Sequence, residues 1–437
     1  MAWFITAIVV GLIPNQVLCD ELPKGPAGLN LQNILIFACL MLLMGVLGKP
    51  KAMEPPQMPK MGRYLKLYLL ISFLALFYAP FFTQDAEFPL SLQNERVQQW
   101  RDELTGMLMF FVAGRCFKTE KDVRKVLFII VIASAYFVWY YLIRYYPEID
   151  RISALPAPEG FTPEEWIEEQ KWMIKRVSGV FTQVGSNEMA GYYVYVAVFC
   201  IGLAWHYRSA FWRFLVPFEV VCLLMGVVYS ASRGAMLATA GAIGYALVRT
   251  RRWFVRIAIF CSAMIPAFAT DDSAATRFEL WKAAFWFGLR YPIGIGYHVF
   301  PMKHKEVHGL KLDTHNYFMR AWAELGPFGF IMVVSFFAAG AKIGWLLHDT
   351  ARTDFTKGLG RGVALMWGAL VVSNMFGDRL SYANFGVVVW TLTGSAFAMI
   401  LKEEKERATE AFPVAPAEPE IIYAAEPRRA PLPAPAR

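Results

Sequence analysis

Long apolar stretches recur along almost the whole of this 437-residue sequence, and they constrain its fold more than any other feature. Runs of about 20 apolar residues match the thickness of the hydrocarbon core of a bilayer. Hydrophobic residues make up 57% of the chain and the mean hydropathy is +0.38, which excludes a water-soluble globule. Because backbone polar groups inside a membrane must be satisfied within the protein, the sequence predicts an all-α polytopic membrane protein.

About twelve runs are long and apolar enough to be counted as membrane-spanning helices. Lysine and arginine concentrate in every second loop between them, which assigns those loops and both termini to the cytoplasm. The two long loops, at about 146–186 and 271–324, then both lie on the outer face. Residues 1–402 are expected to form one membrane domain, and residues 403–437, rich in Ala, Pro and Glu, a disordered cytoplasmic tail. The runs are 2–18, 31–47, 64–82, 104–117, 123–145, 187–205, 211–230, 234–248, 254–270, 325–346, 362–377 and 381–400.

The charge and cysteine patterns exclude two other classes. The formal charge of +8 does not indicate nucleic-acid binding, because most of the basic residues lie in short loops and form no stripe with interleaved aromatic residues. The six cysteines have no CxxC spacing, so the sequence predicts neither a disulfide framework nor a zinc site.

Both long outer loops contain helix signals. Thr162 has the features of an N-cap, and the segment after it reads as an amphipathic helix along the membrane surface. In the second loop, Ser273 is expected to cap a helix that runs to about Arg290. Arg277 and Trp281 then share one face of that helix, because residues four apart are neighbours on a helix surface.

One histidine has the setting of a catalytic base. His315 lies in the sequence Asp313-Thr314-His315-Asn316-Tyr317, at the end of the second outer loop and just before an aromatic, apolar helix. This places an imidazole at a membrane surface, where its ordinary pKa of about 6.5 suits proton transfer near neutral pH. The alternative is a structural histidine that caps the helix.

Three arginines beside predicted membrane boundaries form a candidate anion site. Arg233 stands in Ser232-Arg233-Gly234 between two apolar runs, and Arg277 and Arg176 lie in the outer loops. A guanidinium is a planar fork that fits phosphate oxygens bidentately, so two or three of them can hold a diphosphate. The alternatives are an arginine that reaches the lipid headgroups and, for Arg176, an ordinary basic patch.

Four separated motifs resemble the O-antigen ligase and polymerase superfamily of bacterial inner-membrane glycosyltransferases. They lie in the expected order within residues 176–330, and Ser186 replaces the proline that usually precedes the asparagine of the first motif. The motifs are Arg176-x2-Gly179-x-Phe181 with Asn187-x2-Ala190, Ser232-Arg233-Gly234, Arg277-x3-Trp281 leading to Pro292-x-Gly294-x-Gly296, and His315-Asn316 with Glu324-x-Gly326-x2-Gly329.

The resemblance implies a GT-C-like helical fold in the inner membrane, a periplasmic active site and no metal cofactor. It implies a glycan donor on undecaprenyl diphosphate and an acceptor hydroxyl on lipid A-core, on a growing polysaccharide or on a protein Ser or Thr. His315 would be the catalytic base, Arg233 and Arg277 would bind the donor diphosphate, and Arg176 would be a further donor or acceptor contact. Asn316 and Glu324 belong to the matched motif and are also expected to bind substrate.

Two rival functions stay open at this point. A transporter or flippase of lipid-linked sugars should show interrupted helices in matching halves and polar residues at mid-membrane, and this sequence has few of either. A metal-dependent glycosyltransferase that uses a polyprenyl monophosphate sugar would need an acidic pair, for which Asp20-Glu21 is the candidate. His304 and His308, at i, i+4 spacing, are a further candidate for metal binding.

Overall fold

The computed structural model describes residues 2–13, 31–47, 57–89, 91, 94–140, 162, 164, 186–206, 210–230, 232–247 and 272–411. These ranges contain thirteen α-helices, one short 3-10 helix and no β-strand. The helices are α1 (Ala2–Leu12), α3 (Leu31–Leu47), α4 (Met61–Tyr78), η1 (Ala79–Phe81), α5 (Glu95–Cys116), α6 (Glu120–Tyr140), α9 (Ser186–Ala204), α10 (Ala210–Tyr229), α11 (Arg233–Leu247), α13 (Asp272–Arg290), α14 (Phe300–His308), α15 (Tyr317–Thr350), α16 (Asp354–Met375) and α17 (Ala383–Ala411).

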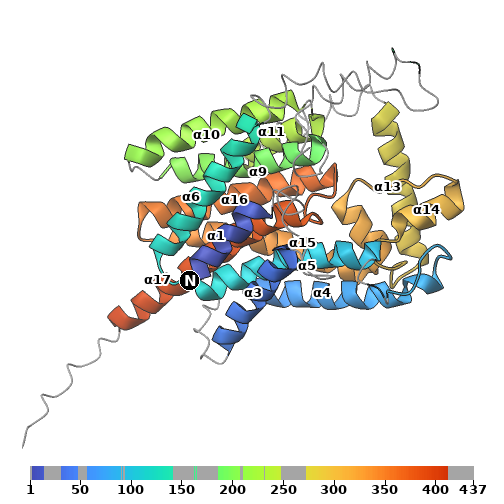
Figure 1. Cartoon of the computed structure of the whole chain (residues 1–437), viewed down its shortest axis with the longest axis horizontal. Helices are drawn as coiled ribbons and strands as arrows, with labels where there is room; N and C mark the ends of the chain where they lie inside the picture. Colours follow the sequence, from blue (N-terminus) through green and yellow to red (C-terminus); the bar gives the residue numbers. More distant parts are fainter. Residues whose placement is uncertain are drawn as a thin grey trace, which may run out of the picture.

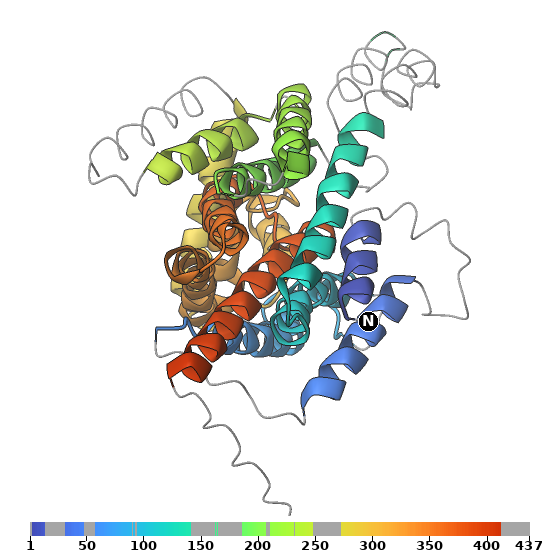
Figure 2. The same ribbon diagram turned by 90° about the vertical axis from the view of Figure 1, so that its left-hand side faces the viewer.

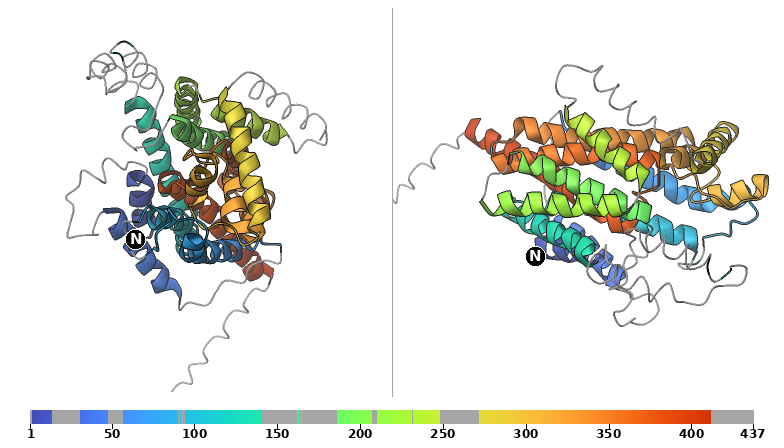
Figure 3. Two further views of the ribbon diagram at one scale, coloured as in Figure 1. Left: turned by 90° about the vertical axis from the view of Figure 1, so that its right-hand side faces the viewer. Right: turned by 90° about the horizontal axis from the view of Figure 1, so that it is seen from above.

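Most of these helices form a bundle whose axes follow the long direction of the molecule, whereas α13 lies across one end of it (Figure 1). Helix α14 lies at the same end, and the two can be seen from that side in Figure 3. Seen from the other end, α9, α10 and α11 form one flank and α1 and α3 the other, with α16 and α17 between them (Figure 2). The bundle therefore has one end covered by a crosswise helix.

Six of the described helices are long and apolar enough to cross a membrane. This agrees with a polytopic membrane protein, whereas the expected number of about twelve spans is not confirmed. Three of the other expected runs lie in the shorter helices α1, α3 and α11, two lie in α5 and α16, and the run 254–270 falls outside the described residues. The six are Met61–Phe81, Glu120–Tyr140, Asn187–Ala204, Trp212–Tyr229, Tyr317–Thr350 and Ala383–Glu410.

The loop helix expected from Ser273 to Arg290 is present as α13, whereas the helix expected after Thr162 falls outside the described residues. Helix α17 continues past residue 403 to Ala411, so residues 403–411 of the expected tail are helical. Glu403 is buried there, and its carboxylate accepts hydrogen bonds from the Arg352 N–H (3.2 Å) and the Thr356 hydroxyl (3.4 Å). These contacts hold the end of α17 against the connection between α15 and α16.

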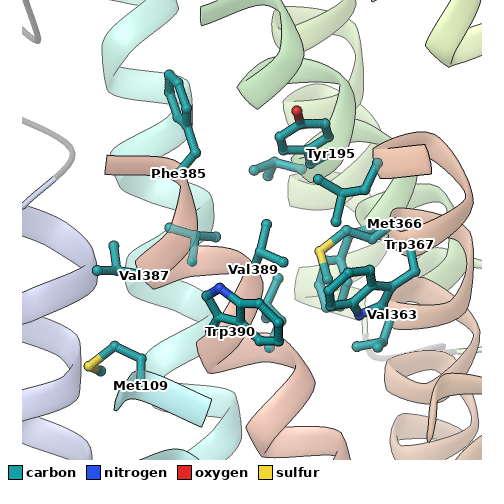
Figure 4. Close-up of a cluster of buried hydrophobic side chains, with 14 of the residues drawn as sticks. Met109, Tyr195, Val363, Met366, Trp367, Phe385, Val387, Val389 and Trp390 are labelled. Carbon is teal, nitrogen blue, oxygen red and sulfur yellow. The ribbon is translucent and has the colours of Figure 1, made fainter. Parts of the chain in front are cut away.

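Large aromatic side chains fill the centre of the bundle. The rings of Trp367 on α16 and Trp390 on α17 lie 5.3 Å apart between centroids, and both are fully buried (Figure 4). The Trp367 indole N–H donates to the Thr393 hydroxyl at 2.9 Å, which satisfies its one polar group. Apolar packing around these two rings joins α5, α9, α16 and α17.

Glycines allow two of the central helices to touch at the backbone. At the crossing of α9 and α16, a Cβ added to Gly202 would lie 2.6 Å from the Gly362 Cα. A Cβ added to Gly362 would lie 2.7 Å from the Phe199 carbonyl oxygen. Inside a membrane, helices are not driven together by the hydrophobic effect, because lipid tails are as apolar as the side chains. Small residues at a crossing instead let the helices approach closely and gain van der Waals contact.

The substitution Gly362→Ala is expected to lower the thermal unfolding midpoint of the purified protein, because the new methyl group forces α9 and α16 apart. Overpacking of this kind costs about 1–3 kcal/mol. Gly45→Ala is the matched control, since a Cβ there meets no atom within 4 Å. Equal midpoints for the two variants would contradict the backbone contact between α9 and α16.

Candidate functional site

His315 lies in a loop whose backbone is fixed on both sides. Its side chain is exposed, and its φ of 48° is in the left-handed region that few residues other than glycine adopt. On one side the Thr314 carbonyl accepts a hydrogen bond from the Trp281 indole N–H at 3.0 Å. On the other side Asn316 caps α15, since its side-chain oxygen accepts from the N–H groups of the next turn, both at 3.0 Å. The imidazole is thus held at a defined point while its ring faces solvent.

The Trp281 contact connects this loop to α13. Arg277 precedes Trp281 by four residues on the same helix, so the two side chains lie on neighbouring turns of one face. Arg277 is half-buried. The structure therefore brings the helix face that carries Arg277 against the loop that carries His315.

Arg233 reaches the same region through Phe376. Arg233 is the first residue of α11 and is exposed. A Cβ added to its neighbour Gly234 would lie 3.2 Å from the Phe376 Cβ, so the backbone of α11 starts in contact with that side chain. The Phe376 ring in turn lies 6.3 Å from the Trp281 ring between centroids. A continuous set of contacts thus joins the segments of Arg233, Arg277 and His315.

The Pro292–Gly296 turn that ends α13 fits into a break in α15. At Gly326 the backbone leaves helical geometry (φ 67°, ψ −171°), and Pro327 follows with no N–H to donate. Carbonyl oxygens at the break accept hydrogen bonds from the turn instead. A Cβ on Gly294 would lie 2.1 Å from the Glu324 carbonyl oxygen, so only glycine fits there. The pairs are Ile295 N to Ala323 O and Gly296 N to Glu324 O, each at 3.0 Å.

Glu324 is buried beneath this turn and serves as a cap for α14. Its carboxylate accepts three backbone hydrogen bonds, from the N–H groups of His298 (2.9 Å), Val299 (3.0 Å) and Phe300 (3.0 Å). The side chain of His298 contacts Glu95, with 3.6 Å between Nε2 and Oε1, and this contact lowers the pKa of Glu95. The hydrogen-bonding capacity of the Glu324 carboxylate is therefore used by backbone N–H groups of the protein.

Residues 218–334 match the family model described as O-antigen ligase. This match supports the resemblance to the O-antigen ligase and polymerase superfamily. The matched segment contains Arg233, Arg277, His315 and Glu324. No curated protein matches the chain.

The family match supports an O-antigen ligase-type transferase activity in general, with a lipid-linked glycan and an acceptor as substrates. It also supports a multi-pass protein of the inner membrane. The family match starts after Arg176, and this residue lies outside the part of the chain that the structure describes. Asn316 is 5% exposed and Glu324 1%. Both side chains are thus enclosed by protein, and their contact with substrate stays a prediction.

The structure adds a buried ionic network that the sequence did not single out. The guanidinium of Arg320 pairs with three carboxylates: Glu103 (2.6 Å), Glu324 (3.7 Å) and Asp378. The Tyr68 hydroxyl donates to the second oxygen of Glu103 at 2.8 Å. The guanidinium also lies over the rings of Tyr297 and Tyr317, 5.7 and 5.2 Å from their centroids. Spacing of Arg320 and Glu324 by one helical turn is the only local signal of this network.

Metal-binding candidates from the sequence do not converge in the described part of the chain. Nδ1 of His304 is hydrogen-bonded to the Leu310 carbonyl at 2.7 Å, and the His304 and His308 rings lie 4.6 Å apart between centroids. No group of three or more His, Cys, Asp or Glu side chains placed for a metal ion occurs within the described ranges. Asp20 and Glu21 fall outside those ranges.

Removing the guanidinium of Arg320 is expected to destabilise the protein strongly. Arg320→Met leaves the buried Glu103 and Glu324 and the partly buried Asp378 without their cation, and breaking a buried ion pair costs about 3–5 kcal/mol. Arg101→Met is the control, because Arg101 forms a partly exposed pair with its neighbour Asp102 at 3.1 Å. Pairs of that kind contribute up to about 1 kcal/mol. Thermal unfolding of the two purified variants compares them, and similar midpoints would contradict a central role for Arg320.

Proposed function

We propose that this protein transfers a glycan from undecaprenyl diphosphate to an acceptor hydroxyl at the periplasmic face of the inner membrane. The observation that carries the proposal is the double contact of Trp281. Its indole N–H holds the loop of His315, and its ring meets Phe376, which also contacts the start of α11. Three segments of the ligase-family match, each with one candidate side chain, thereby meet around one tryptophan.

In this mechanism the two arginines bind the donor diphosphate and stabilise its departure. Each guanidinium of Arg233 and Arg277 can donate two parallel hydrogen bonds to phosphate oxygens. As the bond between the sugar C1 and the diphosphate oxygen breaks, negative charge grows on that oxygen. Fixed cations beside it stabilise the transition state more than the ground state, so no cofactor is needed for this step.

His315 acts as the general base. Its imidazole removes the proton of the acceptor hydroxyl while the hydroxyl oxygen attacks C1 from the face opposite the diphosphate. The old C1–O bond breaks as the new one forms, and the configuration at C1 inverts. The products are the glycosylated acceptor and undecaprenyl diphosphate, and the imidazolium returns its proton to water.

The neighbouring residues position this base and the helices around it. Asn316 starts α15 directly after His315, and Glu324 fixes the N-terminus of α14. Arg176 stays a predicted contact to the donor or the acceptor. These assignments leave the chemistry to one imidazole and two guanidinium groups.

Replacement of His315 by alanine is expected to lower the rate of transfer by about 10²- to 10⁴-fold, the usual contribution of a general base. Release of undecaprenyl diphosphate from a labelled donor in membranes that contain the native acceptor measures this rate. His308→Ala is the control, because His308 is an exposed histidine of the same outer loop. Full activity of the His315 variant would show that His315 is not the general base.

Replacement of Arg233 or Arg277 by lysine keeps the charge but removes the bidentate fork. We expect kcat/KM for the donor to fall about 10- to 100-fold, since a hydrogen bond to a charged group contributes about 1.5–3 kcal/mol. Arg290→Lys serves as the control, because Arg290 is an exposed arginine at the far end of α13. Equal losses in all three variants would argue against a diphosphate site at the first two.

A lipid-linked sugar flippase is the rival function, and proteoliposomes separate the two. A transferase releases undecaprenyl diphosphate only when an acceptor is added, whereas a flippase moves the intact donor between leaflets without cleaving it.

Deletion of the gene, followed by analysis of surface polysaccharide length, lipid A-core capping and glycoproteins, identifies the acceptor. Intact surface glycans in the deletion strain would contradict the transferase.

A further inference from the structure

A basic cavity lies at the end of the bundle opposite the His315 loop. It has a volume of about 520 Å³ and opens between the start of α4, the end of α5 and α17. Four cations line it, together with Phe111 and Leu67. Volumes of about 300–1,000 Å³ are typical of small-molecule sites. The cations are Lys60, Arg63, Lys66 and Arg115.

Helix α4 separates this cavity from the candidate site. Its first turns contribute to the cavity, whereas Tyr78, its last residue, donates a hydrogen bond to the Ile293 carbonyl in the turn after α13 (2.6 Å). The 18 residues of α4 give a length of about 27 Å at about 1.5 Å per residue. This is close to the thickness of a bilayer core, so the cavity and the candidate site lie at opposite membrane surfaces.

The four cavity cations differ from other basic residues at this end of the bundle. None of the four forms a side-chain ion pair with a carboxylate of the described residues, and Lys66 instead lies 5.9 Å from the centroid of the Phe111 ring. By contrast, Arg124 pairs with Glu120, Arg352 with Glu410 and Arg407 with Glu404. Within the described residues, the cavity therefore carries four cations without a carboxylate partner, next to the ring of Phe111.

An apolar stripe leads away from the cavity along α4. Side chains at helical spacing on this face are exposed and carry no charge, as expected for a surface that meets lipid tails. A ligand with a negative headgroup and long apolar chains matches both parts of this surface. The stripe comprises Leu67, Leu70, Phe73, Leu74 and Phe77 of α4, and Phe81 of η1.

We propose that this cavity binds the headgroup of an anionic membrane phospholipid, whose acyl chains lie along the outer face of α4. Its phosphate contacts Arg63 and Arg115, one from each wall, while the two lysines lie at the mouth. Basic pockets between transmembrane helices are suited to such headgroups, because the low dielectric of the membrane strengthens each contact. This lipid site is separate from the transfer chemistry, so the proposal of a lipid site does not depend on the identity of the glycan donor.

Native mass spectrometry of the purified full-length protein tests the proposal, with phosphatidylglycerol and phosphatidylcholine as probes. We expect phosphatidylglycerol to bind and phosphatidylcholine to bind at least about tenfold more weakly, because its headgroup has no net charge. The double variant Arg63→Gln/Arg115→Gln should bind phosphatidylglycerol about 25-fold more weakly, or about fivefold for each cation. Lys66→Gln provides a milder variant at an exposed position, with an expected loss of about fivefold.

The matched control is Lys118→Gln/Lys121→Gln, which removes the same charge from exposed positions outside the cavity. Its affinity should stay within about twofold of the unaltered protein, since the headgroup touches neither lysine. Equal weakening in both double variants would show diffuse attraction and overturn the site. Equal binding of the two phospholipids would also overturn it. Displacement of phosphatidylglycerol by equimolar undecaprenyl phosphate or by inorganic phosphate would assign the cavity to those ligands instead.

Discussion

The buried guanidinium of Arg320 is the interaction on which the site end of the bundle depends. It pairs with carboxylates from three different parts of the chain: Glu103 of α5, Glu324 of α15 and Asp378 between α16 and α17. A buried charge needs partners because desolvation costs several kcal/mol per ion. These pairs therefore hold α5 and the connection between α16 and α17 close to the start of α15. The loop of His315 ends there.

The contacts of Arg320 also hold the helices that surround the candidate site in place. Glu324 contacts Arg320 and also caps α14, and the break in α15 at Gly326 receives the turn that ends α13. Helix α13 is thus fixed at its C-terminal end by this turn and along its length by the hydrogen bond from Trp281 to the His315 loop. Strained backbone at His315 persists only because these contacts define it from both sides.

The two ends of the bundle differ in whether their basic side chains are paired with carboxylates. At the site end, the buried guanidinium groups of Arg320 and Arg379 are paired with carboxylates, and Arg379 contacts Glu188 at 2.6 Å. At the other end, the cavity beside α4 keeps four cations without carboxylate partners among the described residues. Paired arginines stabilise the fold, whereas cations that face an open cavity can attract an anionic ligand. The same helices, α4 and α5, contribute to both ends.

The sequence by itself determined that the chain is helical and bound to a membrane, because hydropathy and helix caps are local properties. It also located α13 and the residues His315, Arg233 and Arg277 beside run ends. Only the tertiary structure decided the partners of Arg320 and Glu324, since Glu103 lies 217 residues from Arg320 in the chain. It likewise decided that Trp281 and Phe376 join the three candidate segments. Contacts between distant residues depend on how helices pack, and no local pattern specifies that packing.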